Sequence, residues 1–405
     1  MDLQEKYGLT RIINANGKMT ALANARVLPE IKDVVYESLD HFFDMNELNE
    51  VVSRRIAAFT GAEAGFVTAC AAAGITLAVA AAMTGKDLGK VAQLPDTTGM
   101  KNEVVLQKGH AVNFGAPVTQ MIRLAGAKPV EVGSVNGTAP AMLAAAINEN
   151  TAAMLFVVSH HTVHYGGVPL VDAVRIAHAK GVPVIVDGAA QSFLLRKIVA
   201  AGADVVVCSG HKYLAGTVAG MACGRKDLIE AMALQNQGIG RTMKVGKEGI
   251  FGLLAALEAR AALDVEAWSE EIRAKVAKVR AALEGIPGVR TETVEDVNGN
   301  PFCRARVHVD PRMAGLDAYA VVKLAARGNP SVRVRPHHVD EGYFDVDVVE
   351  LTGEELELVI ARLQGIFGRA GQDIASAAGN SKTGNLKPGL IEPWFSWLES
   401  REAGN

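Results

Sequence analysis

The sequence has few cysteines, and they follow no recognisable pattern. The four cysteines, at positions 70, 208, 223 and 303, show neither the spacing of a metal site nor that of a disulfide framework. Scattered cysteines of this kind are typical of proteins from a reducing compartment. The N-terminus, Met-Asp-Leu-Gln-Glu-Lys, also lacks a basic region followed by an apolar one, so no signal peptide is expected. We therefore predict a cytoplasmic protein.

An excess of charge of either sign is absent as well. The formal net charge of -3 gives no reason to expect nucleic acid or an anionic membrane as a partner. Residues 64–85 contain no charged side chain and are long enough to cross a bilayer. However, alanine dominates this stretch, which lacks the leucine and isoleucine density of a spanning helix. We predict the end of a strand followed by a buried helix, and no membrane partner.

The pattern along the chain predicts an α/β protein. From about residue 31 to residue 255, apolar strand-like runs alternate with alanine-rich helical runs, which is typical of a mostly parallel, doubly wound sheet. This region is expected to be the large domain. Strands are expected near residues 104–106, 128–132, 153–158, 183–186 and 204–208.

The remaining segments are expected to form an arm, a smaller domain and a tail. Residues 1–30 are the predicted N-terminal arm. A long amphipathic helix, 253–283, is expected to bridge to a smaller α+β C-terminal domain, 256–370. The tail, 371–405, is rich in small residues and contains an apolar segment, 393–398, that we expect to pack on a neighbouring subunit or on the parent domain.

Asp187 and Lys212 carry the main chemical signal. Each follows a short apolar run, and the residues between these runs have helical spacing, so the unit is predicted to be strand, helix, strand. A right-handed crossover would bring both strand ends to the same edge of a parallel sheet, where ligands bind in α/β proteins. Taken singly, Asp187 could cap the next helix and Lys212 could be a solvated loop residue. As a pair they fit pyridoxal phosphate, because a lysine holds the cofactor aldehyde as a Schiff base and a carboxylate keeps the pyridine nitrogen protonated.

A phosphate group needs backbone N–H groups at the start of a helix. The small residues of Thr68-Ala69-Cys70-Ala71-Ala72-Ala73-Gly74 follow a short apolar run and open the uncharged helix, so they can let a phosphate approach closely. A tightly packed buried helix is the alternative. With the Asp187–Lys212 pair present, we predict that residues 69–73, including Ala69, Cys70, Ala71 and Ala72, bind the cofactor phosphate.

The string Ser209-Gly-His211-Lys212 resembles the lysine segment of fold-type-I pyridoxal phosphate enzymes, in particular the class V aminotransferase branch. This resemblance implies the type I PLP-dependent transferase fold and pyridoxal 5'-phosphate as the cofactor. It implies cofactor contacts for further residues: His110 stacking on the ring, Gln191 at the ring hydroxyl, Ser209 at the phosphate, and His211 and Arg241. It also implies a homodimer or larger homo-oligomer.

Three histidines follow the apolar run 153–158, in Ser-His160-His161-Thr-Val-His164-Tyr. They could be read as a metal site, but no acidic residue or cysteine accompanies them, and the following Gly-Gly-Val-Pro indicates a loop rather than a helix. We predict no metal. Instead we expect acid–base assistance from His161 and substrate contacts from His160 and His164.

Two basic segments are candidates for binding a substrate anion. Arg241-Thr-Met-Lys244-Val-Gly-Lys is similar to a basic segment of selenocysteine synthase relatives, and we assign Lys244 to the substrate. In Ser331-Val-Arg333-Val-Arg335-Pro, one arginine must face the cleft if it grips a carboxylate with both ends of its guanidinium. We choose Arg335 over Arg333, because Arg335 adjoins the proline turn.

The arm sequence Arg11-Ile-Ile-Asn-Ala-Asn-Gly extends the resemblance to the selenocysteine synthase-like branch and its ammonia-lyases. The selenium transferase has an additional RNA-binding domain at its N-terminus, whereas this chain begins at the arm and lacks a basic surface. We therefore predict a lyase that removes ammonia by α,β-elimination from a small molecule. The substrate would be a β-hydroxy amino acid or an amino-sugar acid such as D-glucosaminate 6-phosphate. Racemisation, transamination and, more remotely, selenium transfer or a regulatory role remain alternatives.

Overall fold

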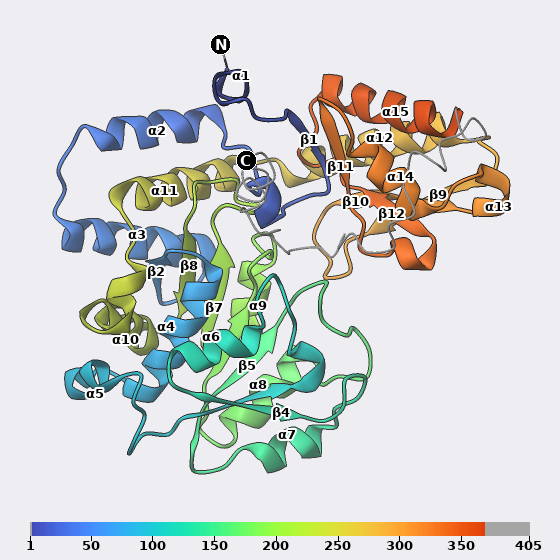
Figure 1. Ribbon diagram of the computed structural model, residues 1–405. Helices are drawn as coiled ribbons and strands as arrows, with labels where there is room; N and C mark the ends of the chain where they lie inside the picture. The colour runs from blue at the N-terminus through green and yellow to red at the C-terminus, as the bar shows by residue number, and fades with distance from the viewer. Residues whose placement is uncertain (1, 369–405) are drawn as a thin grey trace, which may run out of the picture. The chain divides into compact units, whose positions relative to one another are not determined.

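The computed structural model describes residues 2–368 and divides into two compact units (Figure 1). Residues 25–263 form the larger unit. Among the described residues, the smaller unit combines 2–24 with 264–368. The predicted tail, 371–405, and its apolar segment lie outside the described residues.

The larger unit is built on a seven-stranded sheet with the order β2-β8-β7-β6-β5-β3-β4. Neighbouring strands are parallel except at β8, which runs antiparallel to both β2 and β7. The strands are β2 (Ala64–Thr68), β3 (Glu103–Gln107), β4 (Lys128–Val132), β5 (Thr151–Val157), β6 (Val184–Asp187), β7 (Val205–Ser209) and β8 (Gly220–Gly224). The five strands expected from the sequence are present. The sequence gives no signal for β8, because Gly-Met-Ala-Cys-Gly has no β-branched or aromatic residue.

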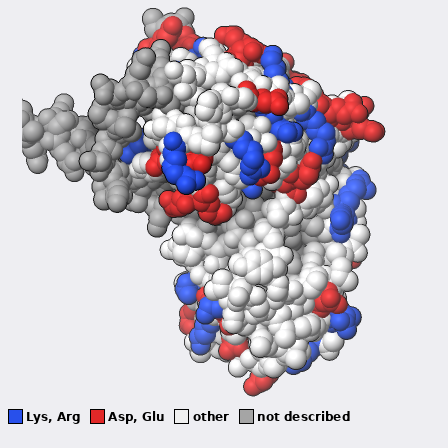
Figure 2. All heavy atoms as spheres, turned by 90° about the vertical axis from the view of Figure 1, so that its right-hand side faces the viewer, with Lys and Arg blue, Asp and Glu red and all other residues white. Residues whose placement is uncertain are grey.

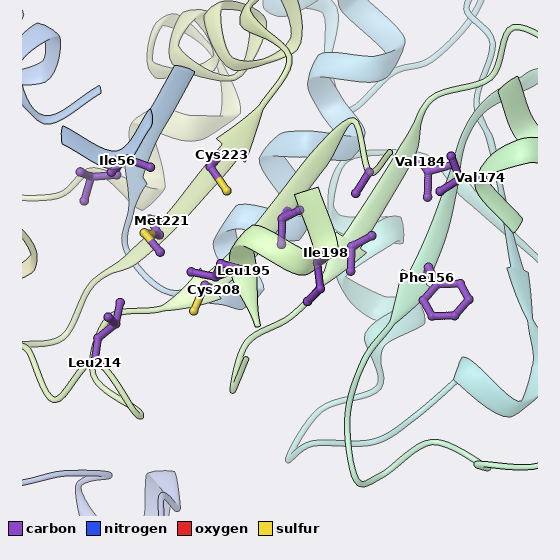
Figure 3. Close-up of a cluster of buried hydrophobic side chains, with 14 of the residues drawn as sticks. Ile56, Phe156, Val174, Val184, Leu195, Ile198, Cys208, Leu214, Met221 and Cys223 are labelled. Carbon is purple, nitrogen blue, oxygen red and sulfur yellow. The ribbon is translucent and has the colours of Figure 1, made fainter. Parts of the chain in front are cut away.

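Side chains alternate between the two faces of this sheet, and each face is covered by helices. Met154 and Phe156 of β5 lie in one apolar cluster, whereas Leu155 and Val157 lie in another. Figure 3 shows part of the first cluster, with Cys208 of β7 beside Leu195 of the helix that precedes β7 in the chain. Helices that contribute to this cluster are α2 (Pro29–Leu39), α3 (Met45–Thr60), α7 (Pro140–Ala146), α8 (Leu170–His178), α9 (Leu195–Ala200) and α11 (Lys247–Ala262).

The second cluster covers the opposite face and is centred on α4 (Ala71–Thr84). This helix is the uncharged stretch, and its burial along most of its length confirms that prediction. Among residues 2–368, no helix is both long and apolar enough to cross a membrane. Around α4 lie α6 (Val118–Leu124) and α10 (Lys226–Leu234). The remaining short helices of this unit are α5 (Leu88–Gln93), η2 (Lys108–His110), η3 (Gln235–Gln237) and η4 (Ile239–Met243).

The smaller unit holds two small sheets. One has the order β12-β10-β9, all antiparallel, and the other pairs β1 with β11 in parallel. The N-terminal arm thus supplies a strand to this unit. The elements are α1 (Leu3–Tyr7), β1 (Ile12–Ala15), η1 (Thr20–Leu22), α12 (Val265–Leu283), β9 (Val289–Glu295), β10 (Cys303–Val309), α13 (Pro311–Ala314), α14 (Ala318–Ala325), β11 (Ser331–Val334), η5 (Val339–Glu341), β12 (Tyr343–Val346) and α15 (Gly353–Gly368).

The prediction of one long helix over residues 253–283 is wrong. The chain forms α11 and α12 instead, separated by Leu263 and Asp264. Leu263 has an extended backbone with ψ 125° and ends α11. The Asp264 side chain accepts a hydrogen bond of 3.0 Å from the Ala267 N–H, which caps the start of α12. The break falls where the chain passes from one compact unit to the other.

Candidate active site

Asp187 and the lysine loop, residues 210–219, lie at the carboxyl ends of two neighbouring parallel strands. Asp187 is the last residue of β6, and its partner across the ladder is Val207 of β7. β7 ends at Ser209, and Lys212 follows after one more turn of chain. The arrangement predicted from the strand–helix–strand pattern is therefore present. The Asp187 side chain is only 6% exposed, and its Oδ1 accepts a hydrogen bond of 3.0 Å from the Ala189 N–H.

The two side chains are close enough to affect each other's charge. Burial raises the pKa of Asp187, and the positive charge of Lys212 opposes this rise. Burial lowers the pKa of Lys212, and Asp187 is the largest of the nearby groups that oppose this fall. Cys208 and Cys70 act on Lys212 in the same sense, so the thiol at the start of α4 also lies near the lysine. Asp187, Lys212 and Cys70 are thus brought together from three elements.

The start of α4, where we predict the phosphate site, packs on the strand next to Asp187. A Cβ atom at Gly74 would lie 2.5 Å from Val207 Cγ1, so the first turn of α4 packs directly on the ladder partner of Asp187. Most of α4 is buried, but Ala69, Cys70 and Ala72 are partly exposed. The first N–H groups of a helix have no acceptor within the helix, and its dipole favours an anion at this end. Cys70 Sγ accepts only a long bond of 3.5 Å from the Ala73 N–H.

These residues fit pyridoxal phosphate. The cofactor requires an amine, a carboxylate for the pyridine nitrogen and an anion site, and Lys212, Asp187 and the start of α4 supply these in one place. Gly220 of β8 contributes to the close packing, because a Cβ atom there would lie 2.5 Å from the Cys70 carbonyl carbon and 2.8 Å from the Ala71 nitrogen. The glycine keeps the backbone before α4 free to approach the sheet.

His110 is buried at the end of η2 and is held as a neutral ring. Its Nδ1 accepts a hydrogen bond of 3.1 Å from the Val157 N–H, which leaves Nε2 to carry the proton. Its ring meets Phe156 edge to face, with centroids 4.4 Å apart. Burial lowers the pKa of His110 to about 4, and the charge of nearby His164 adds to the effect. Its stacking on the cofactor stays a prediction.

Three further predicted cofactor residues lie around the ends of β6 and β7. Gln191 is buried and donates a hydrogen bond of 3.0 Å to the Val158 carbonyl, which ties the turn after β6 to the end of β5. Ser209 is buried at the last position of β7. His211 is partly buried next to Lys212, and its Nδ1 lies 3.1 Å from the Ala219 carbonyl oxygen. Their contacts with the cofactor also stay predictions.

The three histidines after β5 lie on a loop, as expected. The ring centroids of His160 and His161 lie 3.9 Å apart. His164 is close enough to His110 to lower the pKa of His110. Across residues 2–368, no group of three or more histidine, cysteine, aspartate or glutamate side chains is arranged to hold a metal ion.

Gln107 anchors the histidine loop, residues 158–169, and was not among the residues predicted for the site. Its Oε1 accepts a bond of 2.7 Å from the Val168 N–H, and its Nε2 donates a bond of 2.9 Å to the Val168 carbonyl. The side chain therefore pairs with the backbone of the loop as a neighbouring strand would. A polar residue at the end of a buried strand was the available signal.

The basic candidates are placed differently. Arg241 lies on η4 and Lys244 follows it, and both are exposed on the larger unit. Within the described chain, no hydrogen bond or ion pair links them to Lys212 or Asp187. Arg335 lies in the smaller unit and is only 7% exposed; its Nη1 donates a bond of 3.3 Å to the Asn16 carbonyl. Arg333, two residues earlier on β11, is exposed instead.

Comparison with known proteins gives consistent matches. A family model described as SelA, L-seryl-tRNA selenium transferase, matches residues 44–281. The D-glucosaminate-6-phosphate ammonia lyase of Salmonella typhimurium is 40% identical over 365 residues, covering 90% of this chain and 98% of that protein. The 5'-C-glycyluridine monooxygenase-decarboxylase of a Streptomyces species is 38% identical, and the match covers 89% of this chain and 90% of that protein. A solved structure of D-glucosaminate-6-phosphate ammonia-lyase superimposes with a TM-score of 0.81 at 39% identity, covering 91% of this chain and 99% of that one.

Proposed function

The chain belongs to the SelA, or L-seryl-tRNA selenium transferase, family, and from that premise we propose that it is a pyridoxal phosphate-dependent ammonia-lyase. The observation that carries the proposal is the meeting of Asp187, Lys212 and the start of α4 at one edge of the sheet. The cofactor is pyridoxal 5'-phosphate. When bound, it supplies an electron-withdrawing ring that stabilises the charge left on the α-carbon after proton removal.

We assign Asp187 to the pyridine nitrogen of the cofactor, which it would keep protonated. Its Oδ1 already accepts the Ala189 N–H, which fixes the orientation of the carboxylate. Burial disfavours its negative charge, so the carboxylate gains most from a cationic partner at hydrogen-bonding distance. A protonated pyridine nitrogen is such a partner. The geometry thus favours the form of the ring that withdraws electrons most strongly.

Lys212 is the base for the α-proton. An amine must be neutral to accept a proton, and burial lowers the pKa of Lys212, which favours its neutral form. A proton for the leaving β-hydroxyl comes from Lys212 itself or from the histidine loop, where we assign His161. Loss of the α-proton and the hydroxyl as water leaves an enamine. After release, the enamine takes up water and hydrolyses to ammonia and a 2-keto acid.

The substrate is a β-hydroxy amino acid or an amino-sugar acid such as D-glucosaminate 6-phosphate. The similarity to an enzyme named for that substrate, over 98% of its length, supports this choice. We assign His160, His164, Lys244 and Arg335 to substrate binding. Among the described residues on the face shown in Figure 2, basic and acidic side chains are interspersed and form no basic patch for a tRNA.

The Streptomyces relative is named for a different reaction and is almost as similar, so the assay must separate the two chemistries. We expect ammonia and 2-keto acid in equal amounts from D-glucosaminate 6-phosphate, in the presence or absence of oxygen. Oxygen consumption with release of carbon dioxide would instead indicate a monooxygenase-decarboxylase. Stereochemical inversion without ammonia would indicate a racemase, and dependence on a second keto acid would indicate an aminotransferase.

Replacement of Lys212 by Ala is expected to reduce turnover more than about a hundredfold, because the step loses both the cofactor anchor and the base. Product release by the cofactor-loaded variant measures this. Activity above a hundredth of the wild-type value would remove Lys212 from the mechanism. Lys226→Ala, an exposed lysine on α10, is the matched control and should keep wild-type activity.

We also propose that the protein works as a homo-oligomer in the cytoplasm. The last turn of α2 and the segment that follows it expose an apolar patch, which we define as Tyr36, Leu39, Phe42 and Phe43. Phe42 is fully exposed. Aromatic side chains are enriched at protein–protein interfaces. A second copy of the chain is the occupant we propose, because a net charge of only -3 leaves little repulsion between copies.

A further inference from the structure

The lysine loop, residues 210–219, is docked on helix α11 through close backbone contacts. A Cβ atom at Gly216 would lie 2.9 Å from Ala256 Cβ and 3.0 Å from the Gly252 carbonyl oxygen. A Cβ atom at Gly252 would lie 2.0 Å from Thr217 Oγ1. Within the loop, Ala215 has φ 57°, a left-handed conformation that costs about 1 kcal/mol or more for a residue with a side chain. The loop is therefore held in a strained shape by its surroundings.

Arg260, in the last turn of α11, provides a polar contact to this loop. Its Nη2 donates a hydrogen bond to the backbone carbonyl of Tyr213, the residue directly after Lys212. Its guanidinium group lies over the ring of Phe193, with the guanidinium carbon 3.9 Å from the ring centroid, so the two groups form a cation–π contact. Phe193 comes from the segment between β6 and α9, so Arg260 links the lysine loop to the strand that carries Asp187.

No carboxylate neutralises this arginine in the described part of the chain. Its Nε and Nη1 atoms are buried and have no hydrogen-bond partner there, and burial lowers its pKa to about 10. A buried charge without a carboxylate disfavours folding. A contribution to stability therefore does not account for Arg260, whereas its contact with the lysine loop does.

We propose that Arg260 is the positioning residue of Lys212. By fixing the Tyr213 carbonyl, it holds the Tyr213–Leu214 peptide, one residue beyond the lysine, and so sets the direction in which the lysine side chain leaves the loop. The inference rests on the proposed role of Lys212 as the cofactor lysine. Nothing in it requires Arg260 to touch the cofactor or the substrate.

The test uses full-length, cofactor-loaded protein with Arg260→Lys, Arg260→Met and Arg260→Ala. The Lys variant keeps the positive charge but loses the planar guanidinium group. The Met variant loses the charge but keeps an apolar contact with Phe193. The readout is the pH dependence of the visible absorbance of the lysine-linked cofactor. We expect its midpoint to rise by about half a pH unit or more in all three variants, because a loosened loop admits water around the lysine nitrogen.

Kinetic and rescue measurements separate positioning from a general loss of structure. We expect kcat to fall about tenfold or more with KM nearly unchanged, because a misdirected base weakens the chemical step rather than binding. Added guanidinium ion should restore part of the activity of Arg260→Ala. Arg196→Lys is the matched control. Arg196 is an exposed residue of α9 that donates a hydrogen bond of 2.7 Å to the Ala58 carbonyl of α3, and its replacement should leave the titration as in the wild type.

Unchanged midpoints and kcat in folded Arg260 variants would overturn the inference. So would a loss of thermal stability that parallels the loss of activity without rescue by guanidinium. Failure of the proposed function looks different, because Lys212→Ala would then keep the absorbance of a lysine-linked cofactor. If Lys212→Ala loses that absorbance while the Arg260 variants titrate as wild type, only the inference fails.

Discussion

Burial, more than any single partner, sets the charge of the key side chains. It is the largest influence on the pKa of Asp187, Lys212, His110 and Arg260, and in each case it disfavours the charged form. Opposite charges nearby restore part of the ionisation of Asp187 and Lys212. His110 has no such compensation, since its charged neighbour is another histidine.

His110 should make the stability of the protein depend on pH. Its pKa is about 4 in the folded state and about 6.5 in an unfolded chain, so the unfolded state binds more protons between these values. Stability from this residue is therefore fully present above about pH 6.5 and is lost as the pH falls toward 4. The loss between pH 7 and pH 5 should be about 2 kcal/mol.

His110→Gln tests this expectation, because glutamine can accept a hydrogen bond but does not titrate. The thermal midpoint of the cofactor-free wild type should fall more between pH 7 and pH 5 than that of the variant. Equal falls in both proteins would show that His110 does not contribute to the pH dependence.

Some of these residue-level features are readable from the sequence, and others depend on distant partners. Asp187 ends one strand and Lys212 follows the neighbouring strand, so both could be predicted from local pattern alone. The neutral state of His110 could not be, because it depends on Phe156 and Val157, which lie more than 40 positions away. The pairing of Gln107 with Val168 spans 61 positions and is hidden for the same reason.

At the scale of elements, the position of α4 over β7 depends on a missing side chain. Because Gly74 has no side chain, the first turn of α4 packs closely against Val207 of β7. Val207 is buried and cannot easily move aside. Gly74→Ala should therefore destabilise the protein by about 1–3 kcal/mol through overpacking, and should weaken cofactor binding. Thermal unfolding and cofactor titration measure the two effects.

Gly365→Ala is the matched control for this change. Gly365 also lies inside a helix, α15, but a Cβ atom there would meet nothing within 4 Å. The same substitution should raise stability by about 0.4–1 kcal/mol, because alanine restricts the unfolded chain. A loss of stability at both sites would remove the packing explanation for Gly74.

The elements that could not be predicted share a physical cause. β8 forms because the sheet on both sides of it supplies hydrogen bonds, whereas its own sequence has little strand preference. The break between α11 and α12 interrupts a continuous helical pattern, so it depends on the cap at Asp264 and on the change of unit. The α/β class, in contrast, follows from the alternation of strands and helices and is confirmed, as is the family resemblance.

For the whole molecule, the apolar patch of Tyr36, Leu39, Phe42 and Phe43 makes a prediction about assembly. Phe42→Asp should shift the protein toward the monomer, because it places a charge in the surface that we propose is buried by a second copy. Sedimentation velocity measures the shift. Met142→Asp on α7 is the control, because Met142 is also exposed but lies outside the patch. An unchanged oligomer in Phe42→Asp would place the interface elsewhere.

The pairing of β1 with β11 has a consequence for synthesis on the ribosome. Ile12 lies opposite Ser331, so the first strand to be made must wait for about 320 further residues before its partner exists. At about 5–20 residues per second, this delay is roughly 15–60 s, long compared with the folding of a single helix. During that interval the arm is an unpaired strand on a growing chain. The smaller unit can therefore complete its fold only after translation has passed β11, when the larger unit has already been made.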